Sequence, residues 1–132
     1  MFDIDTAIEL FENYERLKSD YHRVVVDTKP FPENYVFDEN QSVKWNREKV
    51  KENNIIREEL KSKKLTLANN SYTEYTDYVN KSIKDELKCS DEAVKEILTF
   101  VAERCYDTPR ETLEHIDEVV GLIKLVLESI KD

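Results

Sequence analysis

The most informative property of this 132-residue sequence is its shortage of glycine and proline. It contains one glycine, Gly121, and three prolines. A phosphate-binding loop or a dinucleotide-binding fingerprint needs several glycines, because the backbone must approach the phosphates closely. Scarcity of both residues also argues against a β-sandwich or β-barrel, whose many turns use glycine and proline. The sequence therefore excludes the common nucleotide-binding loops and favours a helical protein.

Cysteine and long apolar runs are scarce as well. The two cysteines, Cys89 and Cys105, are too few for a disulfide scaffold and lack the CxxC spacing of a zinc site. The longest apolar runs, such as Val24 to Val26, are far shorter than the roughly 20 residues of a membrane-spanning helix. The first twenty residues have no basic n-region, so we expect no signal peptide. These absences predict a cytoplasmic protein with free thiols and no membrane association.

Apolar residues recur at helical spacing along most of the chain. Steps of three and four residues predict five helices, over 4–25, 42–65, 71–87, 90–105 and 108–130. Capping boxes mark two of the starts, at Ser71 and at Thr108, and the second is reinforced by Pro109 at the first helical position. We therefore predict an all-α fold with a single helical domain over 1–132. About five helices would form a mostly antiparallel bundle, with the first, third, fourth and fifth providing the core.

Two segments leave alternatives open. Val24 to Val26 are β-branched, and Tyr-Val-Phe at 35–37 follows a proline-containing loop, so a short β-hairpin near 23–37 is an alternative to helix there. The helix predicted over 42–65 has seven apolar residues among 24, which is few for a core element. We expect 42–66 either to protrude as a helical arm or to require a partner.

The last predicted helix has the most regular apolar pattern in the chain. Its apolar residues follow each other at alternating steps of three and four, as in the heptad seam of a coiled coil. The seam consists of Leu113, Ile116, Val120, Ile123, Leu127 and Ile130, and Val119, Leu122 and Val126 widen it. This width predicts that the helix packs against two neighbours at once.

Charge is divided unevenly along the chain. The formal net charge is −9, yet residues 44–64 carry +4 and residues 85–118 carry −7. The overall sign disfavours direct binding to nucleic acid or anionic lipid. Three interpretations remain: two solvated helix surfaces of opposite sign, a contact between the basic helix and the acidic half within one chain or between copies, or an acidic surface that imitates nucleic-acid phosphates.

No group of residues in the sequence indicates catalysis or metal binding. Several polar residues share the last helix, namely Glu111, Glu114, His115 and Glu118. Their Glu-x-x-x-His spacing occurs once, whereas helical di-metal sites use a repeated Glu-x-x-His. His22 lies beside the first apolar stripe, and Cys105 lies on the stripe of its helix, where we expect it to be buried and inert. We therefore expect no enzyme activity, no cofactor and no bound metal.

Candidate partner-binding residues come from two parts of the chain. Trp45 stands on a helix otherwise rich in charged residues, so it either packs against the loop at 30–37 or anchors a partner. Tyr72, Tyr75 and Tyr78 recur at every third position, and we assign the first two to the core. The candidates are Trp45, Arg47, Ile56, Tyr78, Asp85, Glu86, Asp91, Glu92 and Glu96.

The stretch FDENQSVKWNREKVKENN at 37–54 resembles segments of small acidic accessory proteins from Firmicutes phages and prophages. It follows an amphipathic helix and a proline-containing linker, and its composition, rich in Lys, Asn, Glu and Ile, is similar to theirs. The resemblance covers about a third of the chain and contains no motif with assigned chemistry, so it carries over no residue role. It implies a phage-encoded protein that binds a phage or host protein. Such proteins include inhibitors of host defence nucleases, anti-CRISPR proteins among them, and small assembly or regulatory factors.

Together these observations predict a non-enzymatic, acidic protein-binding protein. Its expected action is to occlude a host protein, such as a basic nucleic-acid enzyme, in the manner of a phage-encoded inhibitor. One alternative is a homo-oligomeric structural, assembly or regulatory factor, with a homodimer paired through the seam of the last helix. The other alternative is a nucleic-acid binder that uses the basic helix at 44–64.

Overall fold

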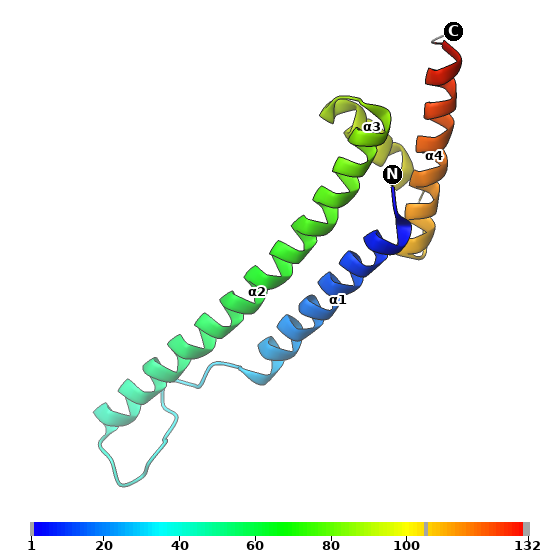
Figure 1. Cartoon of the computed structure of the whole chain (residues 1–132). Helices are drawn as coiled ribbons and strands as arrows, with labels where there is room; N and C mark the ends of the chain where they lie inside the picture. The colour runs from blue at the N-terminus through cyan, green and yellow to red at the C-terminus, as the bar shows by residue number, and fades with distance from the viewer. Residues whose placement is uncertain (1, 105, 131–132) are drawn as a thin grey trace. The chain divides into compact units, whose positions relative to one another are not determined.

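The computed structural model describes residues 2–104 and 106–130, and within them the chain forms four α-helices and no β-strand (Figure 1). The helices are α1 (Ile4–Asp27), α2 (Val43–Leu87), α3 (Asp91–Ala102) and α4 (Pro109–Ile130). This confirms the predicted all-α class. The chain divides into two compact units: unit 1 consists of residues 1–14 and 71–132, and unit 2 of residues 15–70. Helices α1 and α2 each contribute to both units.

The alternative of a β-hairpin near 23–37 is wrong. Residues up to Asp27 continue α1, and residues 28–42 connect α1 to α2 without a strand. The helix ends where both the amide and the hydroxyl of Thr28 donate to the carbonyl oxygen of Val24. Beyond it, Pro30 and Pro32 lack the amide N–H groups that a strand would need for pairing.

Unit 1 contains an aliphatic core. Its largest fully buried side chains are Ile83 of α2, Val101 of α3 and Leu113 of α4. The start of α1, the end of α2, and helices α3 and α4 all contribute to one cluster. Its buried members are Phe2, Ala7, Val79, Ile83, Leu87, Val94, Val101, Leu113, Ile116 and Val120. The first, third, fourth and fifth predicted helices therefore provide the core of unit 1, as predicted.

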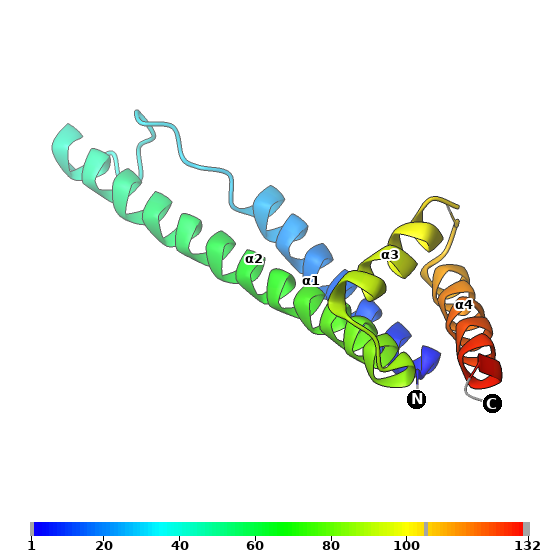
Figure 2. The same ribbon diagram turned by 90° about the horizontal axis from the view of Figure 1, so that it is seen from above.

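Local sequence signals set the two reversals that position α3. Lys88 has a positive φ of 51°, the left-handed conformation that commonly ends a helix. Ser90 then caps α3 by accepting a hydrogen bond from the amide of Ala93 at 3.2 Å, and Thr108 accepts one from the amide of Glu111 at 3.2 Å before α4. Figure 2 shows these short connections before and after α3. The helix start predicted at Thr108 and Pro109 is confirmed.

The helix break predicted at Asn69-Asn70-Ser71 is wrong, because α2 runs without interruption for 45 residues. The second and third predicted helices form the single helix α2, so the described residues contain four helices rather than the predicted five. Asn and Ser each cost a helix only about 0.5–0.7 kcal/mol relative to Ala, and no Gly or Pro is present to stop it. The hydroxyl of Ser71 does not cap a new helix; it is buried and accepts from the side-chain amide of Asn13 at 3.1 Å.

Unit 2 is a helical hairpin. The remainder of α1 and the first part of α2 lie side by side in both views (Figures 1 and 2). Val50 and Ala68 are its buried apolar residues on α2. Residues 42–66, for which the sequence suggested an arm, belong to this part of α2, and Val50 and Asn54 face the rest of the unit.

Tyr72→Pro distinguishes one continuous helix from two. If Ser71 capped a new helix, Pro at the next position would be the favoured first helical residue. In the continuous α2 it removes a hydrogen bond and clashes with the preceding turn, so we expect a loss of about 3 kcal/mol or more in the free energy of unfolding. Urea unfolding followed by circular dichroism measures this. Tyr72→Ala is the control for the lost packing against Tyr14, and equal stability of the two variants would contradict the continuous helix.

Candidate protein-binding surfaces

An apolar groove of about 430 Å³ crosses unit 1 between α3 and α4. Eight of its nine lining residues are apolar or a thiol, and the ninth is a carboxylate. The lining residues are Leu87, Cys89, Ala93, Glu96, Ile97, Phe100, Val119, Ile123 and Leu127. The groove therefore offers a narrow hydrophobic floor with one negative charge.

The groove runs onto a part of α4 that no other described segment covers. Leu113, Ile116 and Val120 are buried, but beyond Ile123 the same seam is open. The large apolar side chains exposed there are Leu122 (64%), Leu125 (64%), Val126 (56%), Leu127 (43%) and Ile130 (72%). Apolar packing of α4 against the rest of unit 1 therefore extends to Ile123 and not to the end of the widened seam. The reason is length: at 1.5 Å per residue α3 is about 18 Å long and α4 about 33 Å.

The two units differ strongly in charge. Unit 1 contains 19 acidic and 8 basic residues, a net −11, whereas unit 2 contains 10 acidic and 12 basic residues, a net +2. The acidic half predicted from the sequence therefore coincides with the unit that contains the groove. A field of this size attracts basic partners to unit 1 and slows the approach of acidic ones.

The acidic candidate residues are not equivalent in the structure. Asp91 forms an ion pair with Lys84 at 3.0 Å, and Glu86 forms one with Lys124 at 2.8 Å. Asp85, Glu92 and Glu96 are exposed, and no ion pair is recorded for them within the described residues; of the five, Glu96 lines the groove. Tyr78, the aromatic candidate in this unit, is half-buried against the core.

The Glu86–Lys124 pair shifts the titration of both groups. Hydrogen bonding to Lys124 and its positive charge lower the pKa of Glu86, and the same contact raises the pKa of Lys124. The pair stabilises unit 1 above the unfolded-state pKa of Glu86, and this contribution is lost as the pH falls through the depressed folded-state pKa. At the alkaline end, the contribution is lost as the pH rises through the raised pKa of Lys124.

The connection between the helices of unit 2 is held to α2 by side chains. The carboxamide of Asn46, itself 6% exposed, accepts from the amides of Phe37 and Asp38 at 2.8 and 3.1 Å and donates to the carbonyls of Asp38 and Ser42. Asn54 accepts from the amide of Phe31 at 2.8 Å and donates to its carbonyl at 3.1 Å. These bonds supply the partners that a buried backbone requires outside regular structure.

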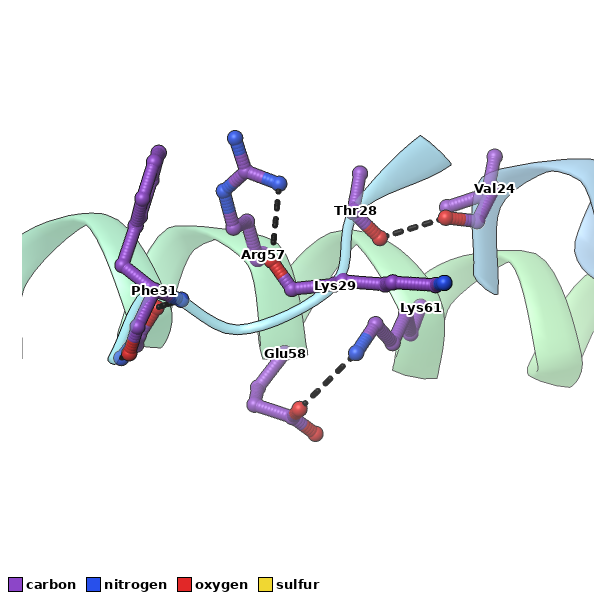
Figure 3. Close-up of polar contacts among 8 residues, drawn as sticks. Val24, Thr28, Lys29, Phe31, Arg57, Glu58 and Lys61 are labelled. Carbon is purple, nitrogen blue, oxygen red and sulfur yellow. Dashed lines mark hydrogen bonds and ion pairs between the residues drawn. The ribbon is translucent and has the colours of Figure 1, made fainter. Parts of the chain in front are cut away.

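Arg57 completes this attachment near the end of α1. Its guanidinium donates to the carbonyl oxygen of Lys29 at 3.2 Å and lies 4.2 Å from the ring centroid of Phe31 (Figure 3). Phe31, Tyr35 and Phe37 contact each other with centroid distances of 4.8–4.9 Å. The loop is thus an aromatic cluster of fixed shape, with Tyr35 43% exposed.

The candidate residues of the basic helix lie in unit 2, near this loop and farther along α2. Arg47 is exposed and lines a pocket of about 470 Å³ together with Tyr35, Val36 and Val43. Trp45 is half-buried, with the ammonium of Lys49 5.4 Å from its ring centroid. Ile56 is 61% exposed. The structure therefore does not gather the nine candidates into one site: three lie in unit 2 and six in unit 1.

The polar side chains considered for metal binding in the sequence do not form a metal-ligating cluster in the described part of the chain. No group of three or more His, Cys, Asp and Glu side chains there is placed to hold a metal ion. The hydroxyl of Tyr106 bonds to Nδ1 of His115, and Phe100 and Tyr106 flank the imidazole. Cys105, expected to be buried, lies outside the described residues. None of the helices traced here has the length and apolar character needed to cross a bilayer.

Sequence reasoning missed the groove and the amide contacts of the loop. The groove depends on how far α4 extends past α3, which is visible only once the boundaries of both helices are known. Asn46 bonds to backbone atoms 8 and 9 residues away, and Asn54 to backbone atoms 23 residues away. Two asparagines at an eight-residue spacing on one helix face are the sole signal, and that spacing is common on solvated helices.

Asn46→Ala should destabilise unit 2. It leaves the amides of Phe37 and Asp38 without acceptors, so we expect a loss of about 1–3 kcal/mol in urea unfolding and faster hydrogen exchange at both amides. Asn53→Ala is the matched control, because the Asn53 side chain bonds only to the carbonyl of Lys49 within the helix. Equal effects of the two substitutions would show that the loop is held by other contacts.

Lys124→Gln should return the pKa of Glu86 toward its ordinary value. The substitution removes the cation that stabilises the carboxylate, so the carboxyl resonance of Glu86 should titrate at higher pH in an NMR experiment. Lys81→Gln, which removes an exposed lysine with no recorded ion pair, should leave the pKa of Glu86 unchanged. An unchanged pKa of Glu86 in Lys124→Gln would mean that the ion pair does not form in solution.

Comparison of the chain with protein-family models, with curated proteins and with solved structures gives no match in any of the three. A functional assignment therefore rests on the surfaces of the two units.

Proposed function

We propose that this chain is a non-enzymatic protein-binding protein and that unit 1 binds a basic amphipathic helix of its partner in the groove between α3 and α4. The observation that carries the proposal is the continuity of this groove with the uncovered half of α4. Contiguous exposed apolar surface of this kind is characteristic of protein-interaction sites. While the partner's helix is bound in the groove, its apolar face cannot contact any other molecule.

The shape and chemistry of the groove support a helical ligand. A helical ligand binds in a groove through apolar anchors at steps of three, four and seven residues, and Val119, Ile123 and Leu127, one turn apart along α4, form an apolar floor that such anchors can contact. Fully burying one aliphatic side chain contributes about 1.5–3 kcal/mol, so several partly exposed ones supply enough to offset the entropic cost of association.

The charge of unit 1 supports a basic ligand. The net −11 of this unit disfavours an acidic helix, and Glu96 adds an exposed carboxylate without a recorded ion pair at the groove itself. Complementary charge raises the rate of encounter and selects among apolar ligands. The same charge disfavours direct binding of nucleic acid by unit 1.

The partner class that fits these requirements is a basic nucleic-acid enzyme, in which amphipathic helices carry Lys and Arg for phosphate contacts. The proposed action is occlusion, as in a phage-encoded inhibitor of a bacterial host protein. It requires neither a catalytic group nor a cofactor. The resemblance of residues 37–54 to phage accessory proteins supports this setting.

The proposal is tested with two designed helical peptides of equal apolar content, one with Lys and one with Glu on its polar face. Fluorescence anisotropy with the full chain should show binding of the Lys peptide and none of the Glu peptide. Leu127→Asp, in the groove, should weaken binding at least tenfold, an effect of about 1.4 kcal/mol. Leu125→Asp is the matched control, because Leu125 is exposed on the same helix but does not line the groove.

Glu96→Lys should also weaken binding and reduce its dependence on salt, because it reverses the charge at the groove. Equal loss with Leu125→Asp and Leu127→Asp would indicate adhesion to exposed apolar surface rather than binding in the groove. Equal affinity for the two peptides would remove the electrostatic part of the proposal, and absence of binding to either would remove the proposal.

A further inference from the structure

A second regular stripe follows α2 within unit 2. Its members are separated by four, three, four, four, three and four residues, which keeps them on one side of a helix. They are Trp45, Lys49, Glu52, Ile56, Leu60, Lys63 and Leu67. Four of the seven are apolar, on a helix segment that is otherwise mostly polar.

Most of this stripe is open to solvent. Ile56 is 61% exposed, Leu60 39% and Leu67 42%, whereas Trp45 and Lys49 are half-buried. The buried Asn46, Val50 and Ala68 lie on the adjacent side of the same segment. The connection at 28–42 is attached to that adjacent side through Asn46 and Asn54. On the stripe itself, Glu52, Ile56, Leu60, Lys63 and Leu67 are left exposed.

We propose that this stripe of α2 pairs with the same stripe of a second copy, antiparallel and around a two-fold axis that passes between Ile56 and Leu60. In such a contact both copies use the same residues, so the surface must be complementary to itself. With Ile56 opposite Leu60 of the second copy, Glu52 lies opposite Lys64 of that copy and beside its Lys63. The pattern therefore places carboxylates against ammonium groups at both ends of the apolar centre.

Charge selects unit 2 over unit 1 as the surface that binds a second copy. Two copies of unit 1 approach each other with a net −11 each, and the resulting repulsion opposes pairing through α4. Unit 2 has a net +2 and both signs on the stripe itself, so the repulsion between two copies is much weaker there. This inference concerns a surface separate from the groove and stands independently of the proposed function.

Sedimentation equilibrium of the full chain tests the pairing. The unmodified protein should be a dimer in the micromolar range, and Ile56→Glu combined with Leu60→Glu should yield a monomer with unchanged helical circular dichroism. Ile55→Glu is the matched control: Ile55 is 57% exposed and adjacent in sequence, but lies off the stripe, so its substitution should leave the dimer intact.

The register is tested by exchanging charges. Glu52→Lys should weaken the dimer at least tenfold, because it brings three ammonium groups together at each end of the contact. Adding Lys63→Glu and Lys64→Glu to the same chain should restore dimerisation. Failure of this rescue, when Glu52→Lys alone does weaken the dimer, would overturn the antiparallel register.

Three other results would overturn the proposal: a monomer at all concentrations, a dimer that survives Ile56→Glu with Leu60→Glu, or a dimer lost on Leu122→Glu in α4 while the stripe is intact. The last result would assign self-association to the seam of α4. Binding of the basic peptide to the groove is measured separately, so either proposal can fail without the other.

Discussion

Burial of one aliphatic cluster, centred on Ile83 and Leu113, is the interaction on which unit 1 depends. Four helical segments contribute to it, and none of them has enough apolar surface to fold alone. Because α3 is only 12 residues long, the cluster closes around α4 as far as Ile123, and most of the apolar side chains beyond that residue are exposed. The groove is thus a consequence of how the core is completed: the face of α4 that stabilises the fold at Leu113 lines an open apolar groove at Leu127.

Unit 2 depends on polar contacts rather than on an aliphatic cluster, because its apolar content is low and the connection between its helices is long. Loops without regular structure need partners for their backbone groups, and here the carboxamides of Asn46 and Asn54 provide them. Arg57 adds a hydrogen bond to the carbonyl of Lys29 and a stacking contact with Phe31. Polar side chains on one side of α2 thereby hold the loop, and the adjacent side leaves Ile56 61% and Leu60 39% exposed.

Charge and apolar surface together divide the proposed binding roles between the units. Unit 1 combines a net −11 with an apolar groove, which suits a basic ligand and opposes self-association. Unit 2 is nearly neutral and has a stripe of mixed charge, which suits a second copy. Ion pairs such as Glu86–Lys124 are exposed and contribute little to this division, because solvent screens them.

The sequence by itself determined the features that depend on neighbours a few residues apart. Helical periodicity, the caps at Ser90 and Thr108, most core residues of unit 1 and the uneven charge could be predicted, because each follows from local hydrogen bonding, apolar spacing or composition. The assignment of Tyr72 to the core is wrong, because that side chain is 47% exposed. Only the tertiary structure decided whether α2 continues through Ser71, since the partner of its hydroxyl is Asn13, 58 residues away. It also decided which half of the α4 seam is exposed and where the loop at 28–42 is attached, because both depend on contacts between segments distant in sequence.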